Sequence, residues 1–133
     1  MQNLNKLLQQ TSLKSTPQRL AILQIIDKYG HISIEDIYNE IKDNFPSISL
    51  ATVYKNINAL KVEEVLSEIH PQNFKAKFEI KKQPHGHFIC KKCNEVYDFE
   101  LQNVCTPNLD TIEDIEESEV YLYGICKKCK NNT

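Results

Sequence analysis

Residues 85–98 have the sequence HGHFICKKCNEVYD, which brings several metal-binding side chains close together. They are His85, His87, Cys90, Cys93 and Asp98. Imidazole, thiolate and carboxylate groups are the ligands of divalent metal ions in proteins. Side chains two positions apart in a strand share a face, so the two histidines can bind one ion together. The CxxC spacing is that of a turn that brings two sulfurs to one cation. The stretch therefore predicts two metal sites side by side.

A second CxxC pair completes the cysteine pattern. Cys126 and Cys129 follow the first pair after 32 residues, and four thiolates in two such turns are the ligand set of a closed, tetrahedral zinc site. A redox motif is the alternative for a single CxxC, but neither pair follows a βαβ pattern. We therefore expect Cys90, Cys93, Cys126 and Cys129 to bind a structural Zn²⁺. The fifth cysteine, Cys105, is expected to be an idle thiol.

The composition shows no strong charge bias. The 133 residues suit one domain or two small ones, and the net charge is −2. Because both halves of the chain are slightly acidic, DNA binding would depend on a local basic patch. The chain has no apolar run of membrane-spanning length, and its N-terminus lacks the apolar segment of a signal peptide. We therefore expect a cytoplasmic protein whose cysteines bind metal rather than form disulfides.

The first half of the chain has the periodicity of helices followed by two strands. Apolar residues at helical spacing predict helices near residues 3–10, 17–29, 33–41 and 49–60. Thr16, Ser33 and Ser49 are the expected N-caps. The period then shortens towards two and predicts strands at residues 65–69 and 75–80. Helices followed by a two-stranded ribbon describe a winged helix-turn-helix domain.

The second half begins after a polar linker. Residues 81–84 (KKQP) contain a proline, and we place a hinge there, between a first domain of residues 1–80 and a second of residues 85–133. In the second domain the pattern predicts strands at residues 86–90, 95–99 and 120–125, and a helix opened by Thr106 and Pro107. The expected fold class is α+β, with an N-terminal winged helix-turn-helix domain followed by a small α/β domain.

Several motifs together match one known family. They are TPQR (16–19), GH (30–31), EDIY (35–38), SLATVYK (49–55), the HxHxxCxxC block with its following Asp-Phe, and YGICxxC (123–129). Over nearly its whole length the chain resembles the ferric uptake regulator superfamily. The resemblance implies a DNA-binding winged-helix domain and an α/β dimerisation domain that holds the four-cysteine zinc site. It also implies a repressor that binds double-stranded DNA as a homodimer, at an inverted-repeat operator.

The resemblance further implies a regulatory metal site at the hinge. Its ligands would be His31, Glu79, His85, His87 and Asp98. Spacing alone would make His31 an exposed loop histidine, as we expect for His70. A mixed set of nitrogen and oxygen ligands suits Fe²⁺ or Mn²⁺ better than Zn²⁺.

Two acidic positions bear on the signal that is sensed. Asp98 is similar to the peroxide-sensing branch, whereas iron sensors of the family usually carry Glu there. Glu79 departs from that branch, which usually has Asp at this position. We expect a peroxide sensor in which bound Fe²⁺ leads to oxidation of His31 or His85. A ferrous-iron-responsive repressor of iron uptake genes is the alternative, and zinc or manganese sensing also stays open.

For the DNA, the helix at residues 49–61 would enter the major groove. The expected contacts are Tyr54, Lys55 and Asn56 near base edges or phosphates, and Lys14 and Arg19 at the backbone.

Two other classes of protein use similar ligands. Histidines and carboxylates also build non-haem iron oxygenases and metallohydrolases, but such enzymes need a substrate cavity, and more than half of this chain is the helical module. A zinc-ribbon interaction module would leave His31 and Asp98 without a role. We therefore expect a regulator and not an enzyme. Retention of an inverted-repeat duplex in a gel shift would discriminate between these classes.

Overall fold

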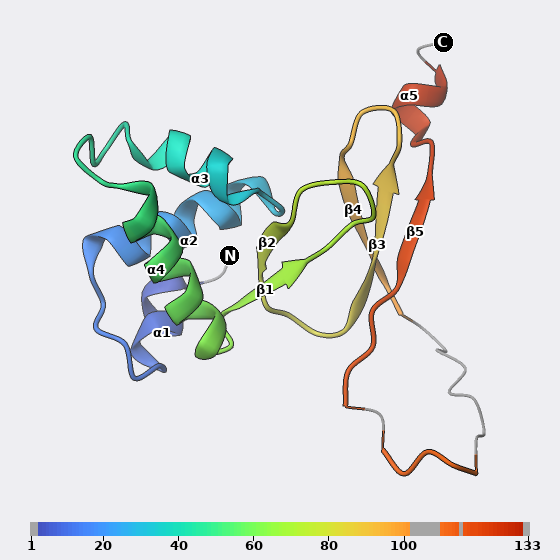
Figure 1. Cartoon of the computed structure of the whole chain (residues 1–133), viewed down its shortest axis with the longest axis horizontal. Coiled ribbons are helices and arrows are strands. Elements are labelled where there is room, and N and C mark those ends of the chain that lie inside the picture. Colours follow the sequence, from blue (N-terminus) through green and yellow to red (C-terminus); the bar gives the residue numbers. More distant parts are fainter. Residues whose placement is uncertain (1–2, 102–109, 115, 132–133) are drawn as a thin grey trace. The chain divides into compact units, whose positions relative to one another are not determined.

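The computed structural model describes residues 3–101, 110–114 and 116–131. The chain divides into two compact units, Met1–Lys81 and Lys82–Thr133 (Figure 1). Cys105 and the helix predicted to begin at Thr106 lie outside the described residues. In the described part of the chain, no helix is both long and apolar enough to cross a membrane.

The first unit contains the helices that the sequence predicted. They are α1 (Leu4–Gln9), α2 (Pro17–Tyr29), α3 (Ile34–Ile41) and α4 (Leu50–Val62) (Figure 1). Each begins after a side chain that accepts a hydrogen bond from the backbone N–H three positions further on. These N-caps are Asn3, Thr16, Ser33 and Ser49. Helix α2 ends at Gly30, whose φ of 78° lies in the left-handed region that glycine adopts without strain.

The helices enclose one apolar core. Fully buried side chains from all four helices meet there: Leu8, Ile22, Leu23, Ile26, Ile37, Ile41, Val53 and Leu60. Within α2, α3 and α4 they recur at short intervals along one stripe, as expected for helices that bury one face. The opposite face of α4 remains at the surface, where the side chain of Tyr54 is 45% exposed.

A two-stranded ribbon completes the first unit. Strands β1 (Leu66–Ile69) and β2 (Lys77–Ile80) pair antiparallel. The second strand begins two residues later than predicted because the turn is longer. In that turn Phe74 N–H donates to the Pro71 carbonyl at 3.2 Å, and Asn73 has a φ of 66°.

One isolated bridge ties the loop after α2 to this ribbon. Ile32 and Phe78 exchange two backbone hydrogen bonds, of 3.2 and 2.8 Å. The bridge brings His31 next to Glu79, although 48 positions separate them in the sequence.

The second unit is a three-stranded sheet followed by a short helix. Its strands are β3 (His85–Cys90), β4 (Val96–Glu100) and β5 (Tyr121–Gly124), in the order β4-β3-β5 (Figure 1). The central strand β3 runs antiparallel to β4 and parallel to β5. Helix α5 (Lys127–Asn131) lies where the sequence predicts only a turn at the second CxxC pair.

Strand β3 sends its potential ligands to both faces of the sheet. Successive side chains alternate, so His85 and His87 lie on one face and Cys90 on the other. Between the histidines, Gly86 lies under the ring of Phe99. A Cβ atom on Gly86 would lie 2.2 Å from Phe99 Cζ. Only glycine fits at this position while the ring stays in place.

Candidate metal centres and DNA-binding surface

Four sulfur atoms converge at one end of the sheet. Cys90 ends β3, and Cys93 lies in the turn that follows. Cys126 immediately precedes α5, and Cys129 lies within it. The four Sγ atoms all lie within 4.8 Å of one another, and the Sγ atoms of Cys93 and Cys126 are 3.9 Å apart. A tetrahedral zinc ion with Zn–S bonds of about 2.3 Å holds its sulfurs about 3.8 Å apart. The cluster therefore fits a structural Zn²⁺.

Backbone amides support the sulfurs. Cys126 N–H donates to Cys90 Sγ at 3.4 Å, and Cys129 N–H donates to Cys126 Sγ at 3.5 Å. The backbone N–H of Cys93 lowers the pKa of Cys90 to about 6. Burial has the opposite effect on Cys129, whose pKa it raises to about 12. Zinc binding must release the Cys129 proton, so the zinc affinity increases with pH.

A tyrosine hydroxyl also contacts the cluster. Tyr97 on β4 donates to the Cys126 sulfur, and this hydrogen bond raises the pKa of Tyr97 to about 12. Tyr97 is the cross-strand partner of Phe88, on the face of the sheet that carries Cys90, and the two rings are 6.3 Å apart. The sequence analysis missed Tyr97, although alternation along β4 puts it on the opposite face from Asp98. A hydroxyl donor of this kind stabilises a thiolate ligand.

The first unit holds two of the five residues expected at the regulatory site. His31 Nε2 lies 3.0 Å from Glu79 Oε2. The loop position that spacing alone predicted to be exposed therefore carries a paired histidine. His70, by contrast, has a side chain that is 62% exposed and pairs with Glu68 at 3.0 Å, as expected for a surface histidine.

The second unit holds the other three residues. Asp98 Oδ1 lies 3.6 Å from Nε2 of both His85 and His87. His85 Nδ1 hydrogen-bonds to the Gln83 carbonyl at 2.9 Å, which favours a proton on Nδ1 and a lone pair on Nε2. The second oxygen of the carboxylate, Oδ2, accepts a hydrogen bond from the ammonium group of Lys82, and the two groups form an ion pair. The sequence analysis did not single out Lys82, because a lysine in a polar linker carries no signal of its own.

These three side chains suit a divalent ion. Ligand bonds of about 2.1 Å place neighbouring ligand atoms about 3 Å apart. Asp98 Oδ1 lies 3.6 Å from each nitrogen and therefore needs only small shifts to reach that spacing. Two imidazoles and a carboxylate are also a recurrent donor set for Fe²⁺.

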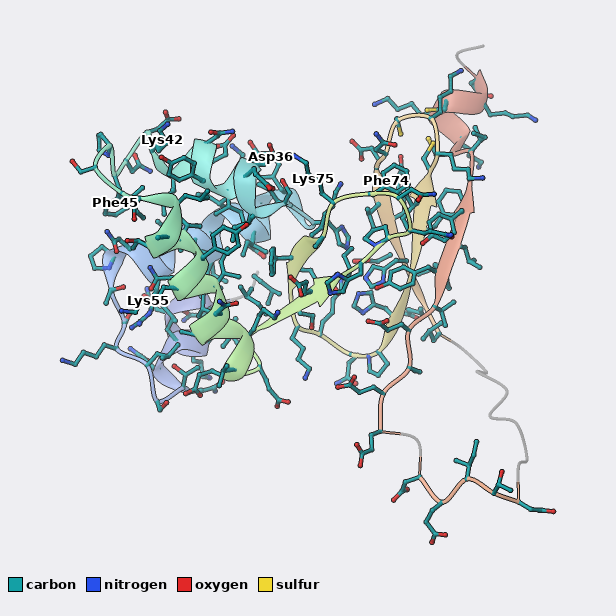
Figure 2. The ribbon with its side chains drawn as sticks, viewed as in Figure 1. Asp36, Lys42, Phe45, Lys55, Phe74 and Lys75 are labelled. Carbon is teal, nitrogen blue, oxygen red and sulfur yellow. The ribbon has the colours of Figure 1, made fainter. Side chains whose placement is uncertain are left out.

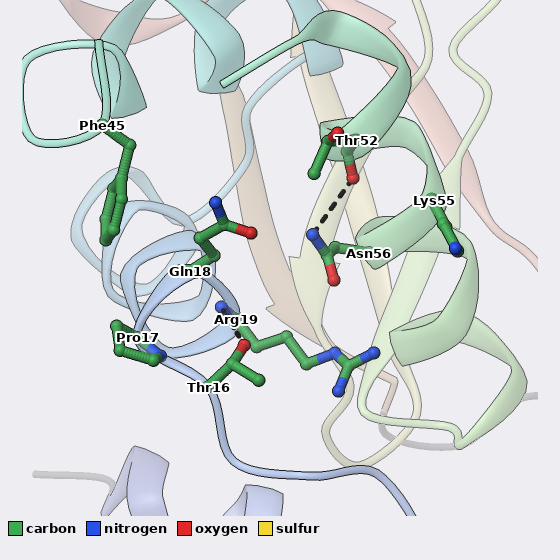
Figure 3. A pocket seen from close by; sticks show the side chains of 8 residues that line it. All are labelled: Thr16, Pro17, Gln18, Arg19, Phe45, Thr52, Lys55 and Asn56. Carbon is green, nitrogen blue, oxygen red and sulfur yellow. Dashed lines mark hydrogen bonds between the residues drawn. The ribbon is translucent and has the colours of Figure 1, made fainter. Parts of the chain in front are cut away.

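The predicted DNA contacts lie at and beside a hollow between α2 and α4. Its volume is about 570 Å³. It is lined by Thr16, Pro17, Gln18, Arg19, Phe45, Thr52, Lys55 and Asn56 (Figure 3). Arg19 Nη1 donates to the Lys14 carbonyl at 2.9 Å. Arg19 Nε is buried, and no hydrogen-bond partner is found for it among the residues that the structure describes. This nitrogen is closed to solvent, so any contact of Arg19 with DNA would use the other guanidinium nitrogens.

The three α4 residues predicted to contact DNA differ in how exposed their side chains are. Tyr54 is exposed, and Lys55 extends from the helix into solvent (Figure 2). Asn56 is 8% exposed, and its Nδ2 donates to the Thr52 carbonyl at 3.1 Å (Figure 3). A base contact by Asn56 would require this bond to break.

Comparisons with known proteins agree on one family. The model of the "Ferric uptake regulator family" matches residues 10–123. The peroxide-responsive repressor PerR of Staphylococcus epidermidis is 31% identical over 133 residues, covering 92% of this chain and 85% of that protein. The solved structure of the Campylobacter jejuni peroxide stress regulator is 35% identical, with a TM-score of 0.70, and the match covers 97% of this chain and 100% of that chain. The solved structure of the Vibrio cholerae ferric uptake regulator is 30% identical, with a TM-score of 0.70, and the match covers 93% of this chain and 100% of that chain.

The match extends over both units of the chain. The fold is α+β, with an N-terminal winged helix-turn-helix domain followed by a small α/β dimerisation domain, as predicted. The protein therefore belongs to the ferric uptake regulator family and is a metal-responsive transcriptional regulator.

Proposed function

We propose that this regulator is a repressor that responds to peroxide through iron-catalysed oxidation of its own histidines. The observation that carries the proposal is the position of Asp98, whose Oδ1 faces Nε2 of both His85 and His87 at 3.6 Å. An aspartate is one methylene shorter than a glutamate, so it leaves more room beside a bound ion. The similarity to peroxide-responsive repressors over 92% of the chain supports the same function.

The proposed regulatory site joins two incomplete sets of ligands. The DNA-binding domain offers His31 and Glu79, and the dimerisation domain offers His85, His87 and Asp98. Neither set alone fills the roughly six positions of an octahedral ion such as Mn²⁺. We assign all five residues to one Fe²⁺ or Mn²⁺ ion, which then favours one relative orientation of the two domains. Metal binding is thereby coupled to DNA affinity.

Histidine oxidation would end the metal-dependent state. A bound ferrous ion would mediate the transfer of one oxygen atom from hydrogen peroxide to an imidazole carbon. In this reaction the ring loses two electrons, the other peroxide oxygen leaves as water, and the iron is not consumed. Mn²⁺ reacts poorly with hydrogen peroxide and would not mediate the step. The hydrogen bond from His85 Nδ1 to the Gln83 carbonyl keeps His85 Nε2 turned to the ion. One oxygen atom added to the imidazole of His31 or His85 makes it a weaker ligand. The domains then leave the orientation that binds DNA, and repression ceases.

The proposed partner is double-stranded DNA, bound by a homodimer in the cytoplasm. Helix α4 would enter the major groove with Tyr54 and Lys55 near base edges or phosphates. Arg19 lines the hollow beside α4 and would contact a phosphate through the terminal nitrogens of its guanidinium group. A two-fold dimer predicts an inverted-repeat operator.

Mass spectrometry after peroxide exposure tests this function. The Fe²⁺ form should gain the mass of one oxygen atom on a peptide that contains His31 or His85, and it should release its operator in a gel shift. The Mn²⁺ form should show neither change. Peroxide sensing is excluded if the Fe²⁺ form keeps both histidines intact and remains on DNA.

A ferrous-iron-responsive repressor is the second candidate. Glu79 favours it, because the peroxide-sensing branch that the sequence resembles usually carries Asp there. The similarity to the Vibrio cholerae ferric uptake regulator is consistent with this function as well. The same ligands would then bind Fe²⁺ reversibly, and operator binding would follow the iron concentration and not peroxide.

A further inference from the structure

The carboxylate of Asp98 has different partners on its two oxygens. Oδ1 faces the imidazole nitrogens of His85 and His87 at 3.6 Å. Oδ2 accepts a hydrogen bond from the ammonium group of Lys82, the first residue of the second unit. All four residues belong to the same unit, so the arrangement does not depend on how the two units are placed.

We propose that Lys82 is a positioning residue that keeps Asp98 monodentate towards the regulatory ion and lowers the affinity of the site for that ion. The inference rests on the proposed function, because it concerns the same ion. It adds a residue beyond the five proposed ligands.

The monodentate geometry follows from the occupied oxygen. A carboxylate that chelates an ion must turn both oxygens towards it. The charge-assisted bond from Lys82 to Oδ2 is among the stronger kinds of hydrogen bond, and it directs Oδ2 away from the histidines. Only Oδ1 is then presented to an ion between His85 and His87. If all five proposed ligands bound one ion, a monodentate Asp98 would leave room at that ion for a small molecule such as peroxide.

The effect on affinity is decided by charge. The ion pair holds the carboxylate in place, which favours metal binding. The lysine also places a positive charge close to a divalent cation, which opposes it. The side chains of Lys82 and Asp98 are 51% and 25% exposed, and their ion pair is already formed before the ion binds, so it contributes little to the free energy of metal binding. The repulsion acts on a double charge and is the larger effect. Removal of Lys82 should therefore strengthen metal binding.

Lys81 provides a matched control. It carries the same charge one position earlier, and its Nζ lies 3.4 Å from Glu64 Oε1 in the first unit. Its removal changes the net charge by the same amount without removing the bond to Asp98.

Manganese affinity of the full-length, zinc-loaded protein provides the first test. Competition with a fluorescent chelator would give the Mn²⁺ dissociation constants of wild type, Lys82→Met, Lys82→Arg and Lys81→Met. Lys82→Met should bind Mn²⁺ about tenfold more tightly, the order expected when one exposed charge near a divalent ion is removed. Lys82→Arg and Lys81→Met should match the wild type. Unchanged or weaker binding by Lys82→Met would overturn the proposal.

Infrared spectroscopy provides a second test, because it reports how the Asp98 carboxylate binds the ion. A purely structural role of Lys82 would leave this signal unchanged. With isotope-labelled aspartate, the separation of the two carboxylate stretching bands distinguishes monodentate from bidentate binding. The wild-type Mn²⁺ complex should show the wide band separation of a monodentate carboxylate. The Mn²⁺ complex of Lys82→Met should show a narrower separation, as expected for a bidentate carboxylate. A bidentate wild-type spectrum would overturn the proposal. Neither experiment involves peroxide, so a failure of histidine oxidation would refute the peroxide function alone.

Discussion

Asp98 lies directly across from His87 in the antiparallel pairing of β3 and β4, with its Oδ1 3.6 Å from His87 Nε2. Residues that face each other on paired strands share a face of the sheet, so this register sets the carboxylate beside the histidines. Cys90 lies on β3 like His87 but on the opposite face of the sheet, and that face also carries Tyr97 of β4. The zinc cluster and the regulatory ligands therefore share β3 while remaining chemically separate.

Lengthening Asp98 should separate peroxide sensing from metal binding. Asp98→Glu adds one methylene and moves the carboxylate into the position that we assign to peroxide. The variant should keep Mn²⁺-dependent operator binding but lose its sensitivity to peroxide in the Fe²⁺ form. Gel shifts with both metals, before and after peroxide, would measure this. A variant as sensitive as the wild type would show that the length of this side chain does not control the response.

Removal of one zinc ligand should abolish the four-sulfur site. Cys93→Ser leaves three thiolates, so we expect zinc content to fall well below one ion per chain. The dimerisation domain should also unfold at a lower temperature, because zinc binding contributes directly to the folding of such a site. Elemental analysis and thermal melts would record both effects. Cys105→Ser is the control and should retain full zinc content.

The Tyr97 hydroxyl should slow the loss of zinc. Tyr97→Phe deletes the hydrogen bond to the Cys126 sulfur and leaves the ring next to Phe88. Removal of a supporting donor of this kind weakens metal binding by about 10-fold to 100-fold. Transfer of zinc to an excess of chelator should accelerate accordingly. If the wild type and Tyr97→Phe lose zinc at the same rate, the hydroxyl has no such role.

A methyl group at Gly86 should destabilise the sheet. The new Cβ of Gly86→Ala would lie 2.2 Å from Phe99 Cζ, and overpacking of this kind costs about 1–3 kcal/mol. Thermal unfolding of the zinc-loaded protein would show the loss, and Phe99→Leu in the same chain should restore part of it. Gly124→Ala is a milder comparison, since its Cβ would lie 3.2 Å from the Phe88 ring.

Two substitutions on the first domain should weaken operator binding alone. Tyr54→Ala removes an exposed side chain of α4, and Arg19→Ala removes the guanidinium group beside the hollow. Dimer mass and metal content should stay normal, because neither residue belongs to a metal site. If Arg19 contacts a phosphate, the salt dependence of binding should also decrease by about one unit of slope. If both variants bind the operator with wild-type affinity, the surface formed by α4 and the hollow does not recognise DNA.

Local patterns predicted most of the secondary structure. Helices α2, α3 and α4 could be placed because Thr16, Ser33 and Ser49 cap them and apolar stripes mark their buried faces. Helix α5 was missed because five residues are too few to show a helical period. The parallel pairing of β3 with β5 was also not predicted, since strand direction depends on a long connection.

The sequence by itself determined the residue types of the candidate sites. Four cysteines in two CxxC pairs specify soft ligands, and the HxH pair specifies imidazoles on one face, because both patterns depend on short spacing and chain geometry. Only the tertiary structure decided which side chains support these ligands. Tyr97 reaches Cys126, and Lys82 reaches Oδ2 of Asp98, through the pairing of segments that are distant in sequence. Such contacts depend on the register and face of the paired strands, and no local pattern encodes them.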